Sequence, residues 1–97
     1  MEIKNVFVMG AGVMGSGIAQ VVAQAGYKVI LEDVSEEFLK RALANIEKGL
    51  GRMVKKGDMS EQDKANIKSR ISATTDLTNA KDADLVIEAI PEDLELN

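Results

Sequence analysis

The 97-residue sequence contains no cysteine, no histidine and no tryptophan, and it has a single proline. Without cysteine there are no disulfides and no thiol chemistry, and the redox compartment is left open. The absence of histidine removes the commonest general base, and that of cysteine removes the strongest side-chain nucleophile. No cluster of metal ligands is evident either. These absences argue against a catalytic or metal centre built from this sequence alone.

Other features of the composition limit the kind of core that the chain can form and the kinds of partner that it can bind. Aromatic residues are only 3% of the chain, so the core must be aliphatic and drawn from the 45% hydrophobic residues. The formal net charge of −4 argues against nucleic acid as a partner. Apolar runs are too short to cross a bilayer, so no membrane segment is expected. Strand-like sequence starts almost at once, so we expect no signal peptide and a cytoplasmic location.

The most informative stretch is a glycine pattern that follows an apolar run. Residues 6–9 are apolar and lead directly into Gly10, Gly12 and Gly15, which are spaced G-x-G-x-x-G. A helical pattern of apolar residues follows at once, so the glycines lie at a strand-to-helix turn. The residues expected on the apolar face of this helix are Ile18, Val21, Val22 and Ala25.

Each glycine of this turn has a physical reason to be glycine. Gly10 permits the tight turn, Gly12 allows a pyrophosphate to approach the backbone, and Gly15 allows the helix to pack close to the strand. Free N–H groups and the helix dipole favour a phosphate at this helix start. A tight turn without any ligand is the simpler alternative, because glycine-rich turns are common.

The next predicted strand favours a nucleotide-binding turn over a turn without a ligand. Residues 28–31 form a short apolar run that ends in Glu32 and Asp33, and Asp33 lies 23 residues after Gly10. The acidic residue that binds the adenosine ribose is expected at ~20 residues. A carboxylate there repels a 2′-phosphate, and no arginine follows directly, so NAD is favoured over NADP. FAD-binding domains and methyltransferases share parts of this pattern, so both remain alternative interpretations.

The whole chain reads as one α/β domain, 1–97. Right-handed crossovers predict a Rossmann-type doubly wound parallel sheet that is partial, with four strands in the order 3-2-1-4. The fourth strand would leave a long apolar edge, which favours pairing with another chain and therefore a homo-oligomer. The predicted strands are 3–9, 28–32, 71–75 and 85–90, and the predicted helices are 13–25, 36–56 and 61–69, with a turn or short helix at 76–82.

Five stretches of the sequence resemble the 3-hydroxyacyl-CoA dehydrogenases, a family that includes the 3-hydroxybutyryl-CoA dehydrogenases. The resemblance extends over essentially the whole chain and is most specific between Gly12 and Gln20. It implies NAD as cofactor, an acyl-CoA substrate, oxidation of 3-hydroxyacyl-CoA to 3-ketoacyl-CoA, and a place in fatty acid metabolism. The stretches that carry it are 8–20, 29–33, 50–57, 71–77 and 84–92.

The resemblance also assigns roles to individual positions. The backbone from Gly10 to Gly15 would hold the pyrophosphate, and Asp33 would hold the adenosine ribose. Lys56 would contact coenzyme A. With Arg52 and Lys55 it forms a basic cluster that could bind phosphate. The alternative is that this cluster only interacts favourably with the dipole at the end of the helix. The expected coenzyme-binding residues are Gly10, Ala11, Gly12, Val13, Met14, Gly15, Asp33, Ala89, Ile90 and Glu92.

This sequence departs from the family in three respects. Gly49 has no side chain for a coenzyme A contact made there in the family, and Asn97 stands where a lysine is usual. The family's catalytic histidine and glutamate, its later strands and its helical domain lie beyond residue 97. The resemblance therefore implies an amino-terminal NAD-binding part without catalytic residues, inactive alone. A non-catalytic nucleotide-binding module and a folded fragment without activity are the alternatives.

Overall fold

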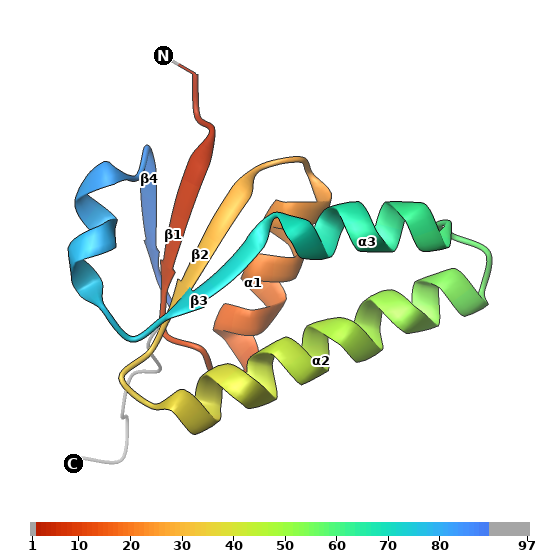
Figure 1. The fold of residues 1–97 in the computed structure, drawn as a ribbon, viewed down its shortest axis with the longest axis horizontal. Coiled ribbons are helices and arrows are strands. Elements are labelled where there is room, and N and C mark those ends of the chain that lie inside the picture. Colours follow the sequence, from red (N-terminus) through yellow and green to blue (C-terminus); the bar gives the residue numbers. More distant parts are fainter. Residues whose placement is uncertain (1, 90–97) are drawn as a thin grey trace, which may run out of the picture.

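The computed structural model describes residues 2–89 of the chain as alternating strands and helices (Figure 1). Their order agrees with the order predicted from the sequence. The elements are β1 (Asn5–Met9), α1 (Val13–Gln24), β2 (Lys28–Glu32), α2 (Glu36–Lys55), α3 (Glu61–Ser69), β3 (Ile71–Thr74), the 3₁₀ helix η1 (Leu77–Asp82) and β4 (Leu85–Glu88).

The four strands form one parallel sheet in the order β3-β2-β1-β4, which confirms the predicted topology. In the central row, Val6 of β1 lies opposite Val29 of β2 and Leu85 of β4. All four strands point the same way, so their carboxyl ends meet at one edge of the sheet. The glycine-rich turn follows β1 at this edge.

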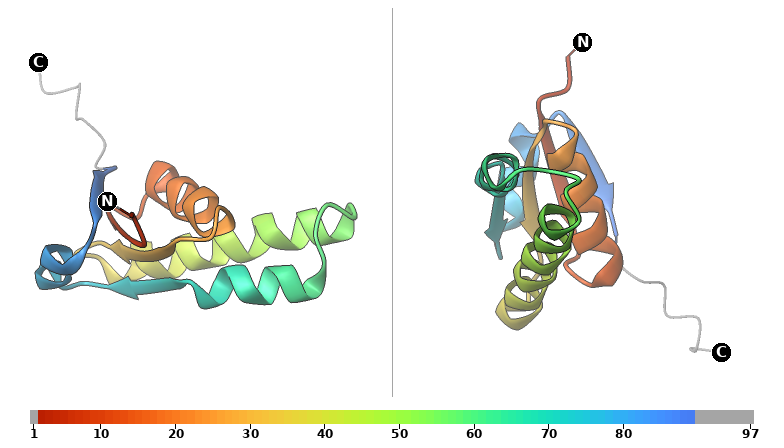
Figure 2. Two further views of the ribbon diagram at one scale, coloured as in Figure 1. Left: turned by 90° about the horizontal axis from the view of Figure 1, so that it is seen from above. Right: turned by 90° about the vertical axis from the view of Figure 1, so that its right-hand side faces the viewer.

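The core lies between one face of the sheet and the helices α1 and α2 (Figure 2). The helix α2 contributes one apolar stripe along its length, as its sequence pattern predicted. The fully or nearly buried members of the core include Val6, Val8, Val29 and Leu31 from the strands and Leu39, Ala42, Ile46 and Leu50 from α2.

The face that α1 turns to the sheet agrees only in part with the prediction, because Ile18 and Val22 pack against the core as expected and the other two residues do not. Val21 is 66% exposed, and Ala25 is also exposed. The buried positions of α1 are instead occupied by small residues, because the helix approaches the sheet too closely for large ones. These small residues are Gly15, Ser16, Ala19 and Ala23.

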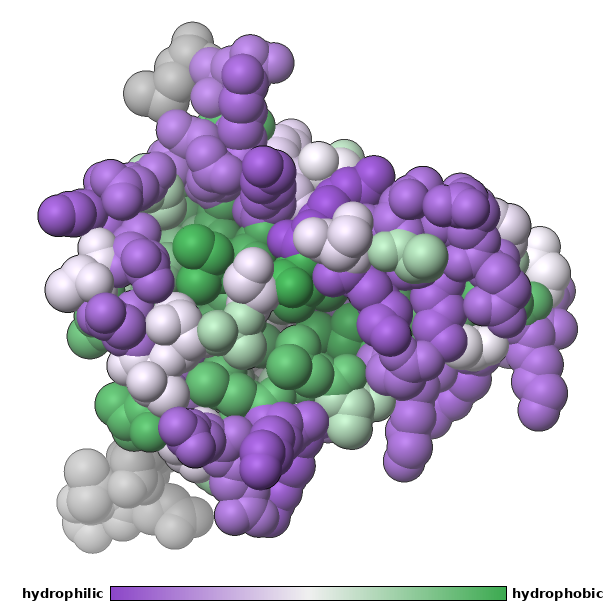
Figure 3. Space-filling view, viewed as in Figure 1, coloured by the Kyte–Doolittle hydropathy of each residue, from purple (hydrophilic) through white to green (hydrophobic). Residues whose placement is uncertain are grey.

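The opposite face of the sheet carries only a partial cover within residues 2–89. Phe7 alternates with Val6 and Val8 along β1, so its buried side chain points to this face, where η1 contacts β1. Apolar side chains gather over the strands in the space-filling view of this face (Figure 3). Among the apolar residues at the surface of the molecule are Leu77 and Val86, which are 49% and 44% exposed.

The ends of most elements agree with their sequence signals. The Ser35 hydroxyl accepts from the backbone N–H of Phe38 at 3.1 Å, and Ser60 and Asp63 form the predicted capping box. Gly26 and Gly57 follow α1 and α2 with φ of 104° and 84°, as expected for left-handed residues after a helix.

The start of β1 differs from the prediction, since the strand begins at Asn5 rather than at residue 3. One carboxylate oxygen of Asp84, just before β4, accepts from the backbone N–H groups of Lys4 and Asn5 at 2.9 Å each. These two hydrogen bonds lower the pKa of Asp84, with the Lys4 bond as the larger cause. A contact between residues 80 positions apart in the chain therefore shapes this strand end.

Candidate functional site

The turn between β1 and α1 depends on two of its glycines. Gly10 has φ of 101°, a conformation that other residues rarely adopt, and its N–H donates to the carbonyl of Glu32 at 2.7 Å. A Cβ on Gly15 would lie 1.7 Å from the carbonyl oxygen of Gly10 and 3.6 Å from the Cβ of Ala89. Only glycine therefore allows α1 to pack this close to β1 and β4.

The first turn of α1 has the properties of an anion site. Gly12 is the N-cap residue, contributes no side-chain cap, and is followed by no acidic residue in the first turn. A Cβ on Gly12 would meet no atom within 4 Å, so the space above it is open. Val13 and Met14 are 86% and 59% exposed. The N–H groups at a helix start have no partner within the helix, so here they face open space.

Asp33 is held against this turn by its own carboxylate. Its Oδ2 accepts from the backbone N–H of Ala11 at 2.8 Å, and its Oδ1 accepts from the backbone N–H of Ser35 at 2.9 Å. Each carboxylate oxygen has further lone pairs, so both can still accept a hydroxyl. The bond to Ala11 was not predicted from the sequence, because it joins residues 22 positions apart.

Glu32, the neighbour of Asp33, occupies a different environment. It is only 5% exposed although it is charged by nature, and its pKa is raised, first by burial and second by the nearby Asp33 carboxylate. Both acids line a cavity of about 250 Å³ at the carboxyl ends of β1 and β2. The remaining lining residues are Met9, Gly10, Val34 and Leu77.

A second hollow adjoins the other side of the glycine-rich turn. It measures about 190 Å³ and lies between the turn, from Ala11 to Val13, and the first half of α2. Its cationic member is Arg41, whose guanidinium pairs with Glu37 at 3.1 Å and lies 6.0 Å from the centre of the Phe38 ring. Arg41 was not predicted as a site residue, since helical spacing alone does not place it beside the turn.

The structure therefore gathers most, though not all, of the predicted site residues. The residues from Gly10 to Gly15, Asp33 and Ala89 lie together at the carboxyl edge of the sheet. Ala89 is 2% exposed and its N–H donates to the carbonyl of Met9 at 2.7 Å. Ile90 and Glu92 lie outside the described residues. These features fit a dinucleotide, with an open helix start for its pyrophosphate and an anchored carboxylate for its ribose.

Lys56 lies apart from this group. It is the C-cap residue of α2, whose 20 residues make a helix about 30 Å long that begins beside Asp33. Gly49, in the same helix, faces α1, because a Cβ there would come within 2.8 Å of the Gln20 side chain. The helix continues through Gly49 and Gly51 without a break.

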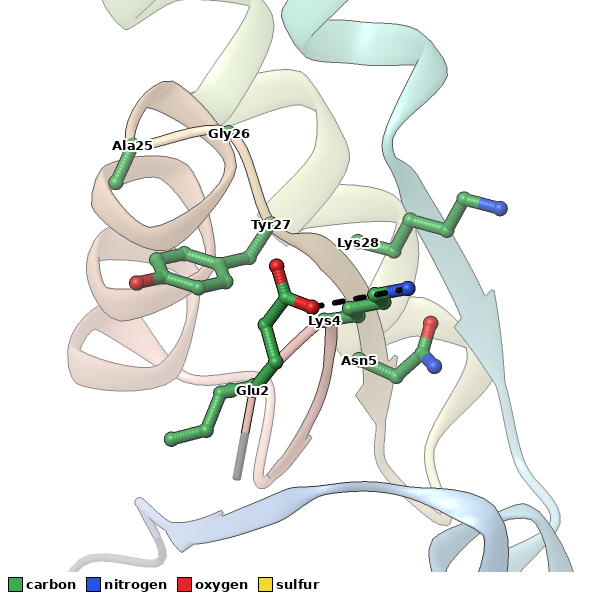
Figure 4. A pocket seen from close by; sticks show the side chains of 8 residues that line it. Glu2, Lys4, Asn5, Ala25, Gly26, Tyr27 and Lys28 are labelled. Atoms are coloured by element: carbon green, nitrogen blue, oxygen red, sulfur yellow. Dashed lines mark ion pairs between the residues drawn. The ribbon is translucent and has the colours of Figure 1, made fainter.

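A larger cavity lies at the opposite end of the sheet. It measures about 770 Å³ and is lined by residues 2–5 and 25–28, at the amino ends of β1 and β2 (Figure 4). Glu2 and Lys4 form an ion pair of 4.0 Å there with both side chains largely exposed. Ligands of open parallel sheets bind at the carboxyl ends of the strands, so we expect no coenzyme in this cavity.

Within residues 2–89, no group of three or more acidic residues could hold a metal ion. None of the helices described is both long and apolar enough to cross a membrane.

Known proteins resemble this chain along nearly its whole length. A probable 3-hydroxybutyryl-CoA dehydrogenase of Deinococcus radiodurans is 46% identical over 89 residues, which are 92% of this chain. A peroxisomal fatty acid beta-oxidation multifunctional protein of Arabidopsis thaliana is 37% identical over 98% of the chain and is covered to 13% of its own length. The crystal structure of Mycobacterium tuberculosis FadB2 superposes with a TM-score of 0.92 at 40% identity, over 96% of this chain and 33% of FadB2.

The chain spans 32% of the length of the Deinococcus protein, about a third of that relative. The family described as "3-hydroxyacyl-CoA dehydrogenase, NAD binding domain" matches residues 5–97. This chain therefore belongs to the family of NAD-binding domains of 3-hydroxyacyl-CoA dehydrogenases.

Proposed function

We propose that this chain is the NAD-binding part of an enzyme that oxidises 3-hydroxyacyl-CoA to 3-ketoacyl-CoA. The observation that carries the proposal is the anchored carboxylate of Asp33 beside the open helix start at Gly12. In that arrangement a ribose acceptor and a set of pyrophosphate donors are already in place. NAD, when bound, supplies the hydride acceptor of the reaction.

In this proposal, backbone N–H groups bind the pyrophosphate and a side-chain carboxylate binds the ribose. The backbone between Gly10 and Gly15 offers N–H donors to the pyrophosphate, with Val13 and Met14 in the first helical turn. Asp33 accepts the hydroxyls of the adenosine ribose. Ala89, Ile90 and Glu92 follow β4 and are proposed to continue the site along the coenzyme.

Coenzyme choice gives the direct test of this proposal. A 2′-phosphate on the ribose would meet the carboxylates of Asp33 and Glu32, which line the same cavity, and like charges at close range repel. Titration calorimetry of the chain with NAD and with NADP should therefore give tighter binding of NAD. Equal or tighter binding of NADP would contradict the assignment, and binding of neither would contradict the function itself.

We propose coenzyme A binding at the far end of α2, around Lys56. Lys56 follows Arg52 and Lys55 at the helix end, where three cations can meet phosphates. Replacing Lys56 by alanine should weaken coenzyme A binding and reduce its dependence on salt, and replacing Lys28 on β2 should change neither. Equal effects of the two substitutions would show that only net charge matters.

We propose that these 97 residues do not transfer hydride on their own. Oxidising a 3-hydroxyl requires a base near the operating pH, and the sequence has no histidine. Positioning of the acyl group, which can supply ~7–11 kcal/mol of a barrier, also requires more protein surface. The assay is NADH oxidation with acetoacetyl-CoA, compared with a blank without protein. Turnover that is lost with Asp33→Ala would show that catalytic residues are present here.

We further propose that the chain forms a homo-oligomer through β4 and that it works in the cytoplasm. Leu85 and Val86 of β4 are 42% and 44% exposed at the edge of the sheet. Sedimentation at rising concentration should show association, and a monomer at every concentration would exclude it. Microscopy of a tagged chain tests the location, since one relative is named as a peroxisomal protein.

A further inference from the structure

The cavity beside Asp33 contains a second carboxylate that the binding of the ribose does not use. Glu32 is the last residue of β2 and is only 5% exposed, yet it lines this cavity of about 250 Å³. Within residues 2–89 its carboxylate makes no hydrogen bond to another group, and no side-chain oxygen is both sealed from solvent and unpartnered. Its oxygens are therefore accessible from the cavity and accept no hydrogen bond from residues 2–89.

The two neighbouring acids serve different parts of this cavity. Asp33 is held against the glycine-rich turn by the N–H groups of Ala11 and Ser35. Glu32 lies opposite Met9 in the register of β1 and β2, so its side chain points to the same face of the sheet as Met9. The rest of the lining is mainly apolar, with Met9, Val34 and Leu77, which suits the flat faces of a base.

A ligand that occupies this cavity should offer a hydrogen-bond donor to Glu32. If the ribose of NAD lies on Asp33, the group next to it is adenine, whose exocyclic amine is a donor. We propose that Glu32 accepts a hydrogen bond from the 6-amino group of adenine and selects adenine over a 6-oxo purine. This inference rests on the proposed binding of NAD and adds the residue that recognises the base.

The chemistry of the alternative base makes the selection strong. In hypoxanthine an oxygen replaces the 6-amino group, so two acceptors would face each other at Glu32, a residue that is only 5% exposed. A site built to accept from a substrate N–H discriminates sharply against an analogue that lacks it, because the buried group is left unpaired. Glutamine in place of Glu32 would offer both a carbonyl acceptor and an amide donor, and would accommodate either base.

The experiment compares NAD with nicotinamide hypoxanthine dinucleotide, which differs at the base alone. Burial raises the pKa of Glu32, so the titration calorimetry is done at about pH 8, well above the ordinary pKa of a glutamate, about 4.3. The unmodified chain should bind NAD at least about tenfold more tightly, as expected for a hydrogen bond to a charged group. Glu32→Gln should reduce this ratio to about threefold or less. The control Asp33→Ala should weaken both dinucleotides and preserve the ratio, because they share the ribose.

The possible outcomes separate this inference from the function on which it rests. Equal binding of the two dinucleotides by the unmodified chain overturns the role of Glu32 and leaves NAD binding standing. Failure to bind either dinucleotide overturns both proposals. An unchanged ratio in Glu32→Gln, with unchanged circular dichroism, also overturns the role of Glu32. The first comparison needs no variant, so it does not depend on whether Glu32→Gln folds.

Discussion

The two ends of the sheet offer hollows of very different size and content. The amino end has the larger one, about 770 Å³, and its ion pair of Glu2 and Lys4 is largely exposed. The carboxyl end has a cavity of about 250 Å³, beside an anchored carboxylate and an open helix start. The comparison shows that fixed donors and acceptors, rather than volume, mark the site of this domain.

The largest effect, on the free energy of unfolding, is expected at Gly15, where α1 packs directly against the backbone of Gly10. Gly15→Ala would place a Cβ 1.7 Å from the Gly10 oxygen, so α1 must move away from β1, at a cost of about 3 kcal/mol of unfolding free energy. Gly17→Ala is the matched control, because a Cβ there meets nothing within 4 Å, and alanine in a helix should add about 1 kcal/mol. Urea denaturation measures both. Similar stabilities would contradict the tight packing at Gly15.

An intermediate effect, on NAD affinity, is expected from a substitution at the carboxyl end of the sheet, and a separate substitution at the amino end is its control. Asp33→Ala should weaken NAD binding by about tenfold or more, since it removes a charged acceptor. Tyr27→Phe, in the large amino-end cavity, should leave NAD affinity unchanged. Titration calorimetry gives both affinities. If Tyr27→Phe had the greater effect, the coenzyme would have to be assigned to the amino end.

The smallest effect is expected at a group of ion pairs away from the coenzyme site. Glu47 of α2 pairs with Lys64 and Lys68 of α3, whose hydrogen bonds lower its pKa from 4.5 to about 2. A depressed folded-state pKa means that the stabilisation is complete above pH 4.5 and is lost as the pH falls to about 2.

Glu47→Gln should therefore lower the urea midpoint slightly at pH 7, because ion pairs that are still partly exposed contribute little. The difference from the unmodified chain should shrink as the pH falls from 4.5 to about 2. NAD affinity should not change. A difference that grew on acidification would contradict the assignment of the ion pairs.

The sequence predicted the strand order and most element bounds because their signals are local. The glycines of the turn, Ser35 and the capping box at Ser60 each specify structure within a few residues of themselves. The errors arose where distant residues meet. Asp84 fixes the start of β1, and close packing at Gly15 turns the small face of α1, rather than Val21, toward the sheet.

The same distinction between local signals and distant contacts applies to the candidate site. The order of the glycine turn and the acidic residue selected Asp33 as a candidate, because that motif has a fixed spacing, and Asp33 does lie beside the turn. The bond from Ala11 to Asp33, the burial of Glu32 and the position of Arg41 were beyond a local pattern. They depend on how two loops at the ends of neighbouring strands approach one another.

The bridge that Asp33 forms between Ala11 and Ser35 has a consequence for the entropy of binding. It links the loop after β1 to the loop after β2, so the proposed acceptor for the ribose is already immobilised in the free protein. Coenzyme binding then avoids much of the ordering cost that a mobile side chain would impose. In hydrogen exchange, the amides of Ala11 and Ser35 should be slow before NAD arrives, and those of Val13 and Met14 should become slow only afterwards.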